Sequence, residues 1–240
     1  MLNKIAKSRS FDLLGVVIVV LAAYFSGYLF ENLNMVTHWG GISDLIPFGI
    51  ISVLASIISL TSDRLVCRIK NLGNWIGLIS VVTSGIIDYL LGNQGAVFTY
   101  PLTFIIQGWA VKTWMHSERF KAAKPLHGLS GVVKIAVILI ASFSFSWWVN
   151  SLGFTQENGL FYTTVLVFGL SLVANVFNAL KLTMQWPFWL FYNLVQLIKA
   201  FIQGNFANVG KYIYYIVNSV AGLSLWFTSR NDNRVTNRSY

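Results

Sequence analysis

NGLFYTTVLVFGLSLVANVFNAL, residues 158–180, contains no Asp, Glu, Lys or Arg. About 20 consecutive apolar residues are enough for a helix to cross a bilayer, so this run predicts a membrane-spanning helix. The whole chain has the same character, since 55% of its residues are hydrophobic and only 10% are charged, against roughly 25% charged residues in soluble domains. Long apolar runs favour helices over the short alternating strands of a barrel. The sequence therefore predicts an all-α membrane protein.

Similar runs elsewhere bring the number of predicted membrane spans to eight. The first could instead be a signal peptide, because Lys4, Lys7 and Arg9 precede it, but its apolar run is long for that role and Ser26-Gly27 is a poor cleavage site. We therefore keep it as a span. The predicted spans cover residues 11–30, 44–61, 73–91, 95–116, 128–149, 158–180, 184–203 and 206–228.

The chain has a net charge of +9, but its basic residues do not form a tract suited to nucleic acid. Their positions follow the predicted topology instead. Connections near 31–43, 92–94, 150–157 and 204–205 contain no Lys or Arg. Because cytoplasmic loops are enriched in these residues, both termini are predicted to be cytoplasmic, in a bacterial inner membrane. The basic residues assigned to the inner side are Lys4, Lys7, Arg9, Arg64, Arg68, Lys70, Arg119, Lys121, Lys124, Lys181, Arg230, Arg234 and Arg238.

An internal repeat relates two parts of the chain by a constant shift of 112 residues. The shift places Gly92-Asn93 on Gly204-Asn205, Tyr100 on Tyr212 and Trp114 on Trp226. Spans two to four then correspond to spans six to eight, with span five as a connector, although a few matches can arise by chance in so biased a composition. Parallel repeats of this kind are typical of transporters. The predicted parts are an extra helix in 1–43, a first triple-helix bundle in 44–116, a linker helix in 117–157, a second bundle in 158–228 and a tail in 229–240.

Residues suited to catalysis or metal binding are few. His38, His116 and His127 fall outside the spans or at their edges, where solvated histidines are a better interpretation than a metal site. The lone Cys67 lies in a predicted polar connection beside Arg64 and is expected to be a free thiol. There are no paired carboxylates in the spans and no phosphate-binding loop. The sequence predicts neither an enzyme nor a cofactor.

Charged residues within spans are the usual sign of ion coupling, because they are costly in the membrane. Asp88 and Lys211 lie near the outer ends of their predicted helices and Lys134 near an inner end, so we expect them to reach toward the interface. Lys199, deeper in its span, is the exception. A passive facilitator is favoured over a proton-driven pump.

The densest group of aromatic residues is QWPFWLFYN, residues 185–193. Trp186, Trp189 and Asn193 are spaced i, i+3 and i+7, so they share one helix face. Indole rings and an amide suit a flat heteroaromatic ligand with polar substituents. Trp186 could instead belong to an interfacial aromatic belt.

Uncharged amides are the second polar feature of the spans. Gln107 and Asn218 lie at mid-membrane depth, and Asn74, Asn175 and Asn178 lie nearer the helix ends. A single membrane amide commonly links two helices. As a set, these side chains predict a polar central cavity.

The pattern W-x-x-W-x-x-x-N formed by Trp186, Trp189 and Asn193 resembles that of the bacterial nicotinamide riboside transporters called PnuC. The predicted arrangement of one, three, one and three helices also resembles PnuC, whose members look like full-length relatives of the SWEET sugar transporters. The resemblance covers about residues 44–228, with the first helix as an addition seen in some members. Thiamine and riboflavin transporters of the same family share this architecture.

The resemblance implies uptake of nicotinamide riboside, an NAD precursor, by facilitated diffusion with cytoplasmic trapping by phosphorylation. It also implies that Trp186, Trp189 and Asn193 bind this small molecule, and that the chain forms a trimer, for which the sequence itself identifies no interface. Gln107, Asn74 and Asn218 are added to the predicted site from their depth and chemistry. The repeat predicts alternating access by rocking of one triplet against the other. A membrane enzyme or assembly factor that uses the aromatic face to hold a lipid or a partner helix is the remaining alternative.

Overall fold

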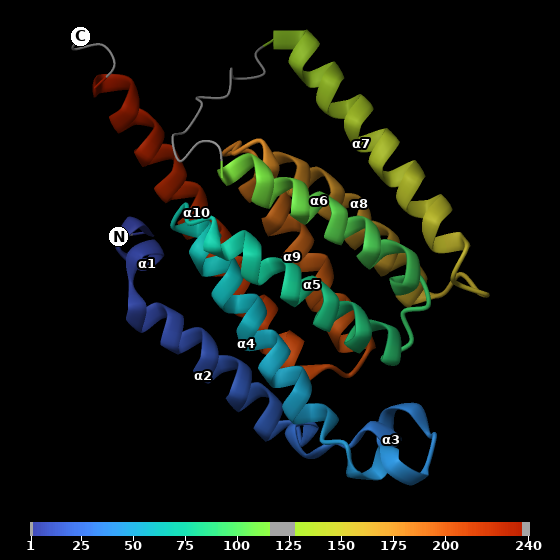
Figure 1. Ribbon diagram of the computed structural model, residues 1–240. Coiled ribbons are helices and arrows are strands. Elements are labelled where there is room, and N and C mark those ends of the chain that lie inside the picture. Colours follow the sequence, from blue (N-terminus) through green and yellow to red (C-terminus); the bar gives the residue numbers. More distant parts are fainter. Residues whose placement is uncertain (1, 116–127, 237–240) are drawn as a thin grey trace.

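The computed structural model describes residues 2–115 and 128–236, and within them it contains helices and turns but no strand. The elements are α1 (Leu2–Lys7), α2 (Arg9–Phe25), η1 (Tyr28–Phe30), α3 (Leu33–Thr37), η2 (Gly41–Leu45), α4 (Phe48–Cys67), α5 (Leu72–Leu90), α6 (Ala96–Met115), α7 (Gly128–Ser151), α8 (Gly159–Ala179), α9 (Gln185–Ile202) and α10 (Phe206–Thr236). The long helices lie roughly parallel or antiparallel to one another (Figure 1).

A helix lies over each of the eight predicted spans. The local sequence explains where several of these helices begin or end. Asn158 begins α8 by accepting the backbone N–H of Phe161 at 3.0 Å, an N-cap that satisfies one free donor. In α9, Pro187 lies in the first turn, where its missing N–H removes no bond of the helix. The first predicted span is shorter than expected, because α2 ends at Phe25 and a separate 3-10 turn follows.

Helix α4 departs from the prediction, because it continues to Cys67 instead of ending near residue 61, and α10 likewise continues to Thr236, past the predicted end at residue 228. We placed Arg64 and Cys67 in a polar connection, and that prediction was wrong. Arg64 lies within the helix and is only 2% exposed. Its guanidinium donates to Asp12 of α2 at 2.5 Å and to the side-chain oxygen of Asn218 in α10. Hydropathy falls at this point, yet the helix continues because its charged residue has buried partners.

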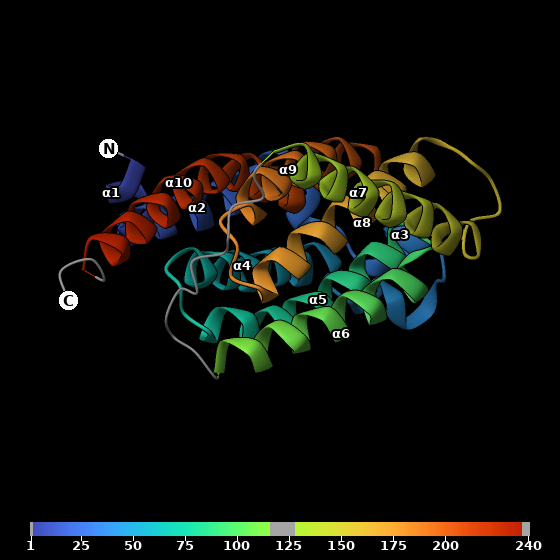
Figure 2. The ribbon, with the colours of Figure 1, turned by 90° about the horizontal axis from the view of Figure 1, so that it is seen from above.

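The helices pack in two consecutive groups that face each other. Helix α5 contacts both α4 and α6, and α9 contacts both α8 and α10. The groups meet where α4 packs on α10 and α6 packs on α8. Outside them, α2 lies against α4 and α10, and α7 lies mainly against α8. Viewed from above, α4, α5 and α6 form one layer, with α9 and α10 above it (Figure 2).

The backbone repeats with the same shift that relates the sequence motifs. Gly92 and Gly204 both have positive φ, of 89° and 65°, at the turn after the second helix of each group. Each turn is closed by a backbone bond five residues back, from Asn93 to Asp88 at 3.0 Å and from Asn205 to Ala200 at 3.0 Å. This is the Schellman arrangement, in which glycine adopts the left-handed conformation without a Cβ penalty.

A second pair of turns follows the first helix of each group. Ile69 and Lys181, which the same shift relates, have positive φ values of 62° and 55°. The bonds that close these turns run from Lys70 to Leu65 and from Leu182 to Phe177. A left-handed residue that is not glycine is uncommon, so its recurrence at matching positions indicates that both groups have the same local construction.

Both ends of the described chain meet at one end of the bundle. Asn3 in α1 donates to Thr228 and accepts from Ser224, two residues of α10. Figure 1 shows the N-terminal helix and the end of α10 on the same side. By length and mean hydropathy alone, two of the described helices, α4 and α8, could cross a membrane.

Candidate binding cavity

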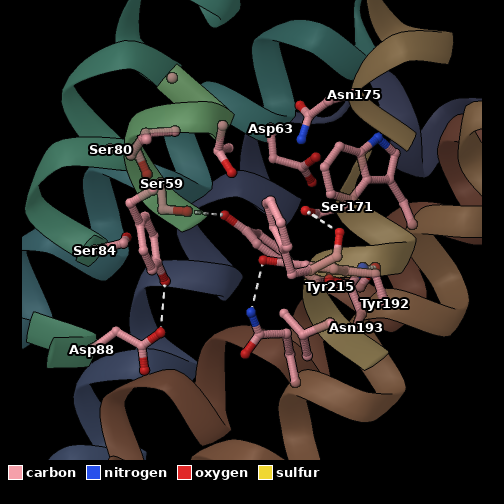
Figure 3. Close-up of a pocket in the computed structure, with 18 of the residues that line it drawn as sticks. Ser59, Asp63, Ser80, Ser84, Asp88, Ser171, Asn175, Tyr192, Asn193 and Tyr215 are labelled. Atoms are coloured by element: carbon pink, nitrogen blue, oxygen red, sulfur yellow. Dashed lines mark hydrogen bonds between the residues drawn. The ribbon is translucent and has the colours of Figure 1, made fainter. Parts of the chain in front are cut away.

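A cavity of about 170 Å³ lies in the centre of the bundle. Apart from Asn93, in the turn between α5 and α6, the residues that line it belong to α4, α5 and α6 on one side and to α8, α9 and α10 on the other. Serine, threonine, tyrosine and amide side chains make up much of the wall, and Figure 3 labels several of them, including Ser59, Asn175 and Asn193, together with Asp63 and Asp88. A polar interior inside an apolar bundle needs a ligand or water to complete its hydrogen bonds.

The cavity lies between the two repeats, because residues related by the repeat shift line both of its sides. Ser59 is matched by Ser171, and Tyr100 is matched by Tyr212. A third match places Asp63 opposite Asn175, so the two repeats differ there by one charge. Sequence reasoning matched Tyr100 with Tyr212 but did not assign either to the site, and applying the shift to every polar residue of the spans would also have found Ser59 with Ser171.

Helix α9 contributes two of the six predicted site residues to the wall, Trp189 and Asn193. Asn193 is held by its amide nitrogen, which donates to the hydroxyl of Ser219 at 2.9 Å and to the carbonyl of Tyr215 at 3.4 Å. The Trp189 indole N–H donates to the side chain of Gln185 at 3.4 Å. Its ring meets the ring of Tyr192 edge to face, with centroids 5.1 Å apart. The aromatic face of α9 is therefore set in place by neighbours before any ligand binds.

Trp186 lies outside the cavity wall. It is 1% exposed and packs edge to face on Trp226, with ring centroids 5.9 Å apart. Gly222 of α10 leaves the space for this ring, because a Cβ on Gly222 would come within 2.7 Å of the indole. The same helix face thus points Trp189 into the cavity and Trp186 into a buried contact between helices.

Gln107 lines the cavity, whereas Asn74 stands behind it as a support. The Gln107 amide nitrogen donates to the backbone and side-chain oxygens of Asn74, each at 3.2 Å. Asn178 of α8 donates to the same side-chain oxygen at 2.9 Å. Asn74 therefore joins α5 to α6 and α8 and fixes the orientation of Gln107.

Asn218 also supports the wall without lining it. Its amide nitrogen donates to the carboxylate of Asp63 at 2.5 Å, and its oxygen accepts from Arg64. Asp63 is the residue that reaches the cavity. Three of the six predicted residues, Trp189, Asn193 and Gln107, thus line the cavity, and Asn74, Asn218 and Trp186 lie in the layer around it.

Charged residues line the opposite end of the cavity, where the sequence predicted side chains reaching outward. Asp88, Lys199 and Lys211 are all buried and all line the wall. The Lys199 ammonium lies 2.6 Å from the Asp88 carboxylate, which ties α9 to α5. In Figure 3, Asp63 and Asn175 are drawn at one end of the pocket and Asp88 at the other. Position near a helix end misled the prediction for Asp88 and Lys211, because Asp88 turns toward Lys199 in the facing group and Lys211 lines the cavity.

The remaining candidates do not form a site in the described part of the chain. Within it, no group of three or more His, Cys, Asp or Glu side chains could hold a metal ion. His116 and His127 lie outside the described residues, as does the side chain of Lys134. Cys67 is a buried free thiol at the end of α4.

Comparison with known proteins places the chain among membrane transporters. The model of the nicotinamide mononucleotide transporter family matches residues 49–228. The crystal structure of the vitamin B3 transporter PnuC has the same fold, with a TM-score of 0.66 and 16% sequence identity over 92% of each chain. Among curated proteins, none matches this chain.

Proposed function

Since the chain belongs to the nicotinamide mononucleotide transporter family, whose solved member PnuC shares its fold, we propose that this multi-pass membrane protein takes up nicotinamide riboside. The observation that carries the proposal is the cavity between the two repeats, lined by an indole and two amides at Trp189, Asn193 and Gln107. The pyridinium ring of the riboside is cationic and suits the face of an indole. Its carboxamide can pair with the amides, and its ribose with serine and tyrosine hydroxyls.

The proposed arrangement in the membrane is eight spans in the order one, three, one and three, with both termini cytoplasmic in the inner membrane. The repeated turns and the two facing helix groups support it, with residues 44–116 and 158–228 as the two bundles. Residues 1–43 would form the extra helix, 117–157 the linker helix and 229–240 the tail. Lysine and arginine are missing from the connections assigned to the outer side, in keeping with the excess of these residues in cytoplasmic loops.

The proposed mechanism is facilitated diffusion by alternating access, with phosphorylation in the cytoplasm trapping the product. Polar contacts join the two groups near both ends of the cavity. At one end Lys199 of α9 pairs with Asp88 of α5, and at the other Asn218 of α10 donates to Asp63 of α4. Rocking of one group against the other would open one of these contacts while the other holds.

Equilibrium binding of nicotinamide riboside to the purified protein tests the proposal. Trp189→Ala and Asn193→Ala remove the stacking ring and an amide of the wall, and each is expected to weaken binding about tenfold or more. Trp148→Ala is the matched control, because Trp148 is 59% exposed on α7 and lies outside the cavity. Trp186→Ala is expected to lower the melting temperature more than the affinity, since it empties a buried site.

Competing ligands complete the experiment. Binding of thiamine or riboflavin in place of the riboside would assign the chain to another substrate of the same family. A folded protein that binds none of these vitamins, and moves none of them across liposome membranes, would contradict transport and favour a membrane enzyme or assembly factor.

A further inference from the structure

Lys211 is a buried lysine that the proposed riboside does not need. It lies in the second turn of α10, is 3% exposed and lines the cavity. Its ammonium stands 4.7 Å from the centroid of the Tyr212 ring. Among the described residues, no carboxylate forms an ion pair with it. A buried ammonium without a counter-charge is costly, so a ligand that supplies the missing negative charge would bind strongly here.

Asp88 lies near enough to interact with Lys211 electrostatically, but its carboxylate already accepts four hydrogen bonds. Its carboxylate already accepts from Lys199 at 2.6 Å, from Asn93 at 2.6 Å, from Gln203 at 2.6 Å and from Tyr100 at 3.0 Å. Two oxygens that receive four donors are close to saturated. Lys199 in turn uses one of its three N–H donors on Asp88 and lies near Lys211. This end of the cavity therefore has an excess of positive charge.

The other end of the cavity presents a carboxylate. Asp63 lines it and accepts from the neutral amide of Asn218, whereas the nearby Arg64 does not line the cavity and is paired with Asp12. Lys211 precedes Asn218 by seven residues on the same helix, which separates the two along the axis by about 10 Å. The cavity is thus polarised along its length, with a carboxylate at one end and an unpaired ammonium at the other.

We propose that Lys211 forms an anion subsite that takes a phosphate group, while the end of the cavity with Asp63 and Trp189 takes the pyridinium cation. The inference rests on the proposed function. It extends the proposed ligand from a cation alone to a cation together with a phosphate anion. The phosphate has two sources, the 5′-phosphate of nicotinamide mononucleotide or a free phosphate ion bound beside the riboside. Trapping by phosphorylation requires the second source, because a site that accepts the mononucleotide would also release it.

Calorimetric binding to the wild type and to Lys211→Met tests the subsite in phosphate-free buffer. Methionine has a similar length without the charge, so the fold is expected to persist. Binding of the mononucleotide, or of the riboside with added phosphate, is expected to weaken roughly 10- to 100-fold, the range of a charge-assisted hydrogen bond. Binding of the riboside alone should stay the same or tighten, because a like charge is gone. A purely structural role for Lys211 would weaken all three together and would overturn the proposal.

Two further variants sharpen the result. Lys211→Arg keeps the charge and should restore most of the phosphate-dependent binding. Lys4→Met makes the same chemical change at an exposed lysine of α1 that lies outside the cavity and should have no effect.

The choice of ligand distinguishes the two sources of phosphate. It also distinguishes failure of the Lys211 subsite from failure of the proposed function. Tight mononucleotide binding without added phosphate identifies the nucleotide as the source, whereas riboside affinity that rises with added phosphate identifies the free ion. Equal binding of every probe to the wild type and to Lys211→Met overturns the subsite and leaves riboside transport standing. Phosphate binding through Lys211 in a protein that binds no riboside contradicts the proposed function alone.

Discussion

The buried pair of Asp88 and Lys199 is the residue contact on which one end of the cavity depends. Both side chains are almost inaccessible, and the carboxylate also orders Asn93, Tyr100 and Gln203 through hydrogen bonds. Such a pair contributes little net free energy when compared with well-packed apolar residues, but removing one partner leaves a charge buried alone. Its value lies in fixing which helices meet, since it joins α5 to α9.

Asp88→Asn is therefore expected to destabilise the protein by roughly 3–5 kcal/mol, because the ammonium of Lys199 loses its counter-charge. The double variant Asp88→Asn with Lys199→Met should recover most of that loss. Thermal unfolding of the purified protein measures both. If the single variant melts at the wild-type temperature, Asp88 is not needed to neutralise the buried ammonium of Lys199.

At the scale of elements, the two helix groups hold each other through a pair of crossed contacts. The Trp114 indole at the end of α6 donates to the carbonyl of Asn178, near the end of α8, at 2.8 Å. The Trp226 indole of α10 donates to the carbonyl of Cys67, at the end of α4, at 3.0 Å. The last carbonyls of a helix lack donors within it. Each tryptophan therefore donates to a carbonyl near the end of the first helix of the other group.

Trp114→Phe and Trp226→Phe each remove one of these bonds and keep an aromatic ring. Trp226→Phe is expected to lower the free energy of unfolding by about 1–3 kcal/mol, because the Cys67 carbonyl loses the indole donor. Trp114→Phe is expected to lower it by less, about 1 kcal/mol, because the Asn178 carbonyl keeps the backbone N–H of Lys181. Trp148→Phe on the exposed surface of α7 serves as the control and should change it little. Thermal unfolding compares the three variants, and a larger loss in Trp114→Phe than in Trp226→Phe would contradict this difference.

For the whole molecule, orientation in the membrane is the property to test. Lys4 on α1 and Gln156 between α7 and α8 are both exposed, and the native Cys67 is buried. In intact cells a membrane-impermeant thiol reagent is expected to label Gln156→Cys and to spare Lys4→Cys until the cells are opened. Labelling of both in intact cells, or of Lys4→Cys alone, would overturn the proposed topology.

The positions of the long helices were readable from the sequence because bilayer thickness imposes a length and an apolar composition on a segment that crosses it. The repeat was readable for a related reason. Gly92 and Gly204 are needed where the backbone turns left-handed, so the same letters recur wherever the same turn recurs. The family was identified by the resemblance of the pattern formed by Trp186, Trp189 and Asn193 to that of known members, and the family match confirmed it.

Periodicity along one helix did not decide which of its side chains meet the cavity. Trp186 and Trp189 share a face of α9, but Gly222 on the opposing helix admits the first ring into a buried contact and leaves the second in the cavity wall. Likewise Asn218 was recognised as a membrane amide, while its role as the support of Asp63 depends on α4 lying beside α10. These assignments require knowledge of the neighbouring helix.

The sequence by itself thus determined the helical class, the repeat and the residue types that a polar cavity uses, because each of these is set by local composition and spacing, and it contains the pattern by which the chain resembles its family. Only the tertiary structure decided the partners of the buried charges. Asp88 and Lys199 are far apart in the chain, and their attraction becomes a contact only after α5 and α9 pack together. Lys211 has no such partner among the described residues, and that difference from Lys199 could not be read from either residue's place in its helix.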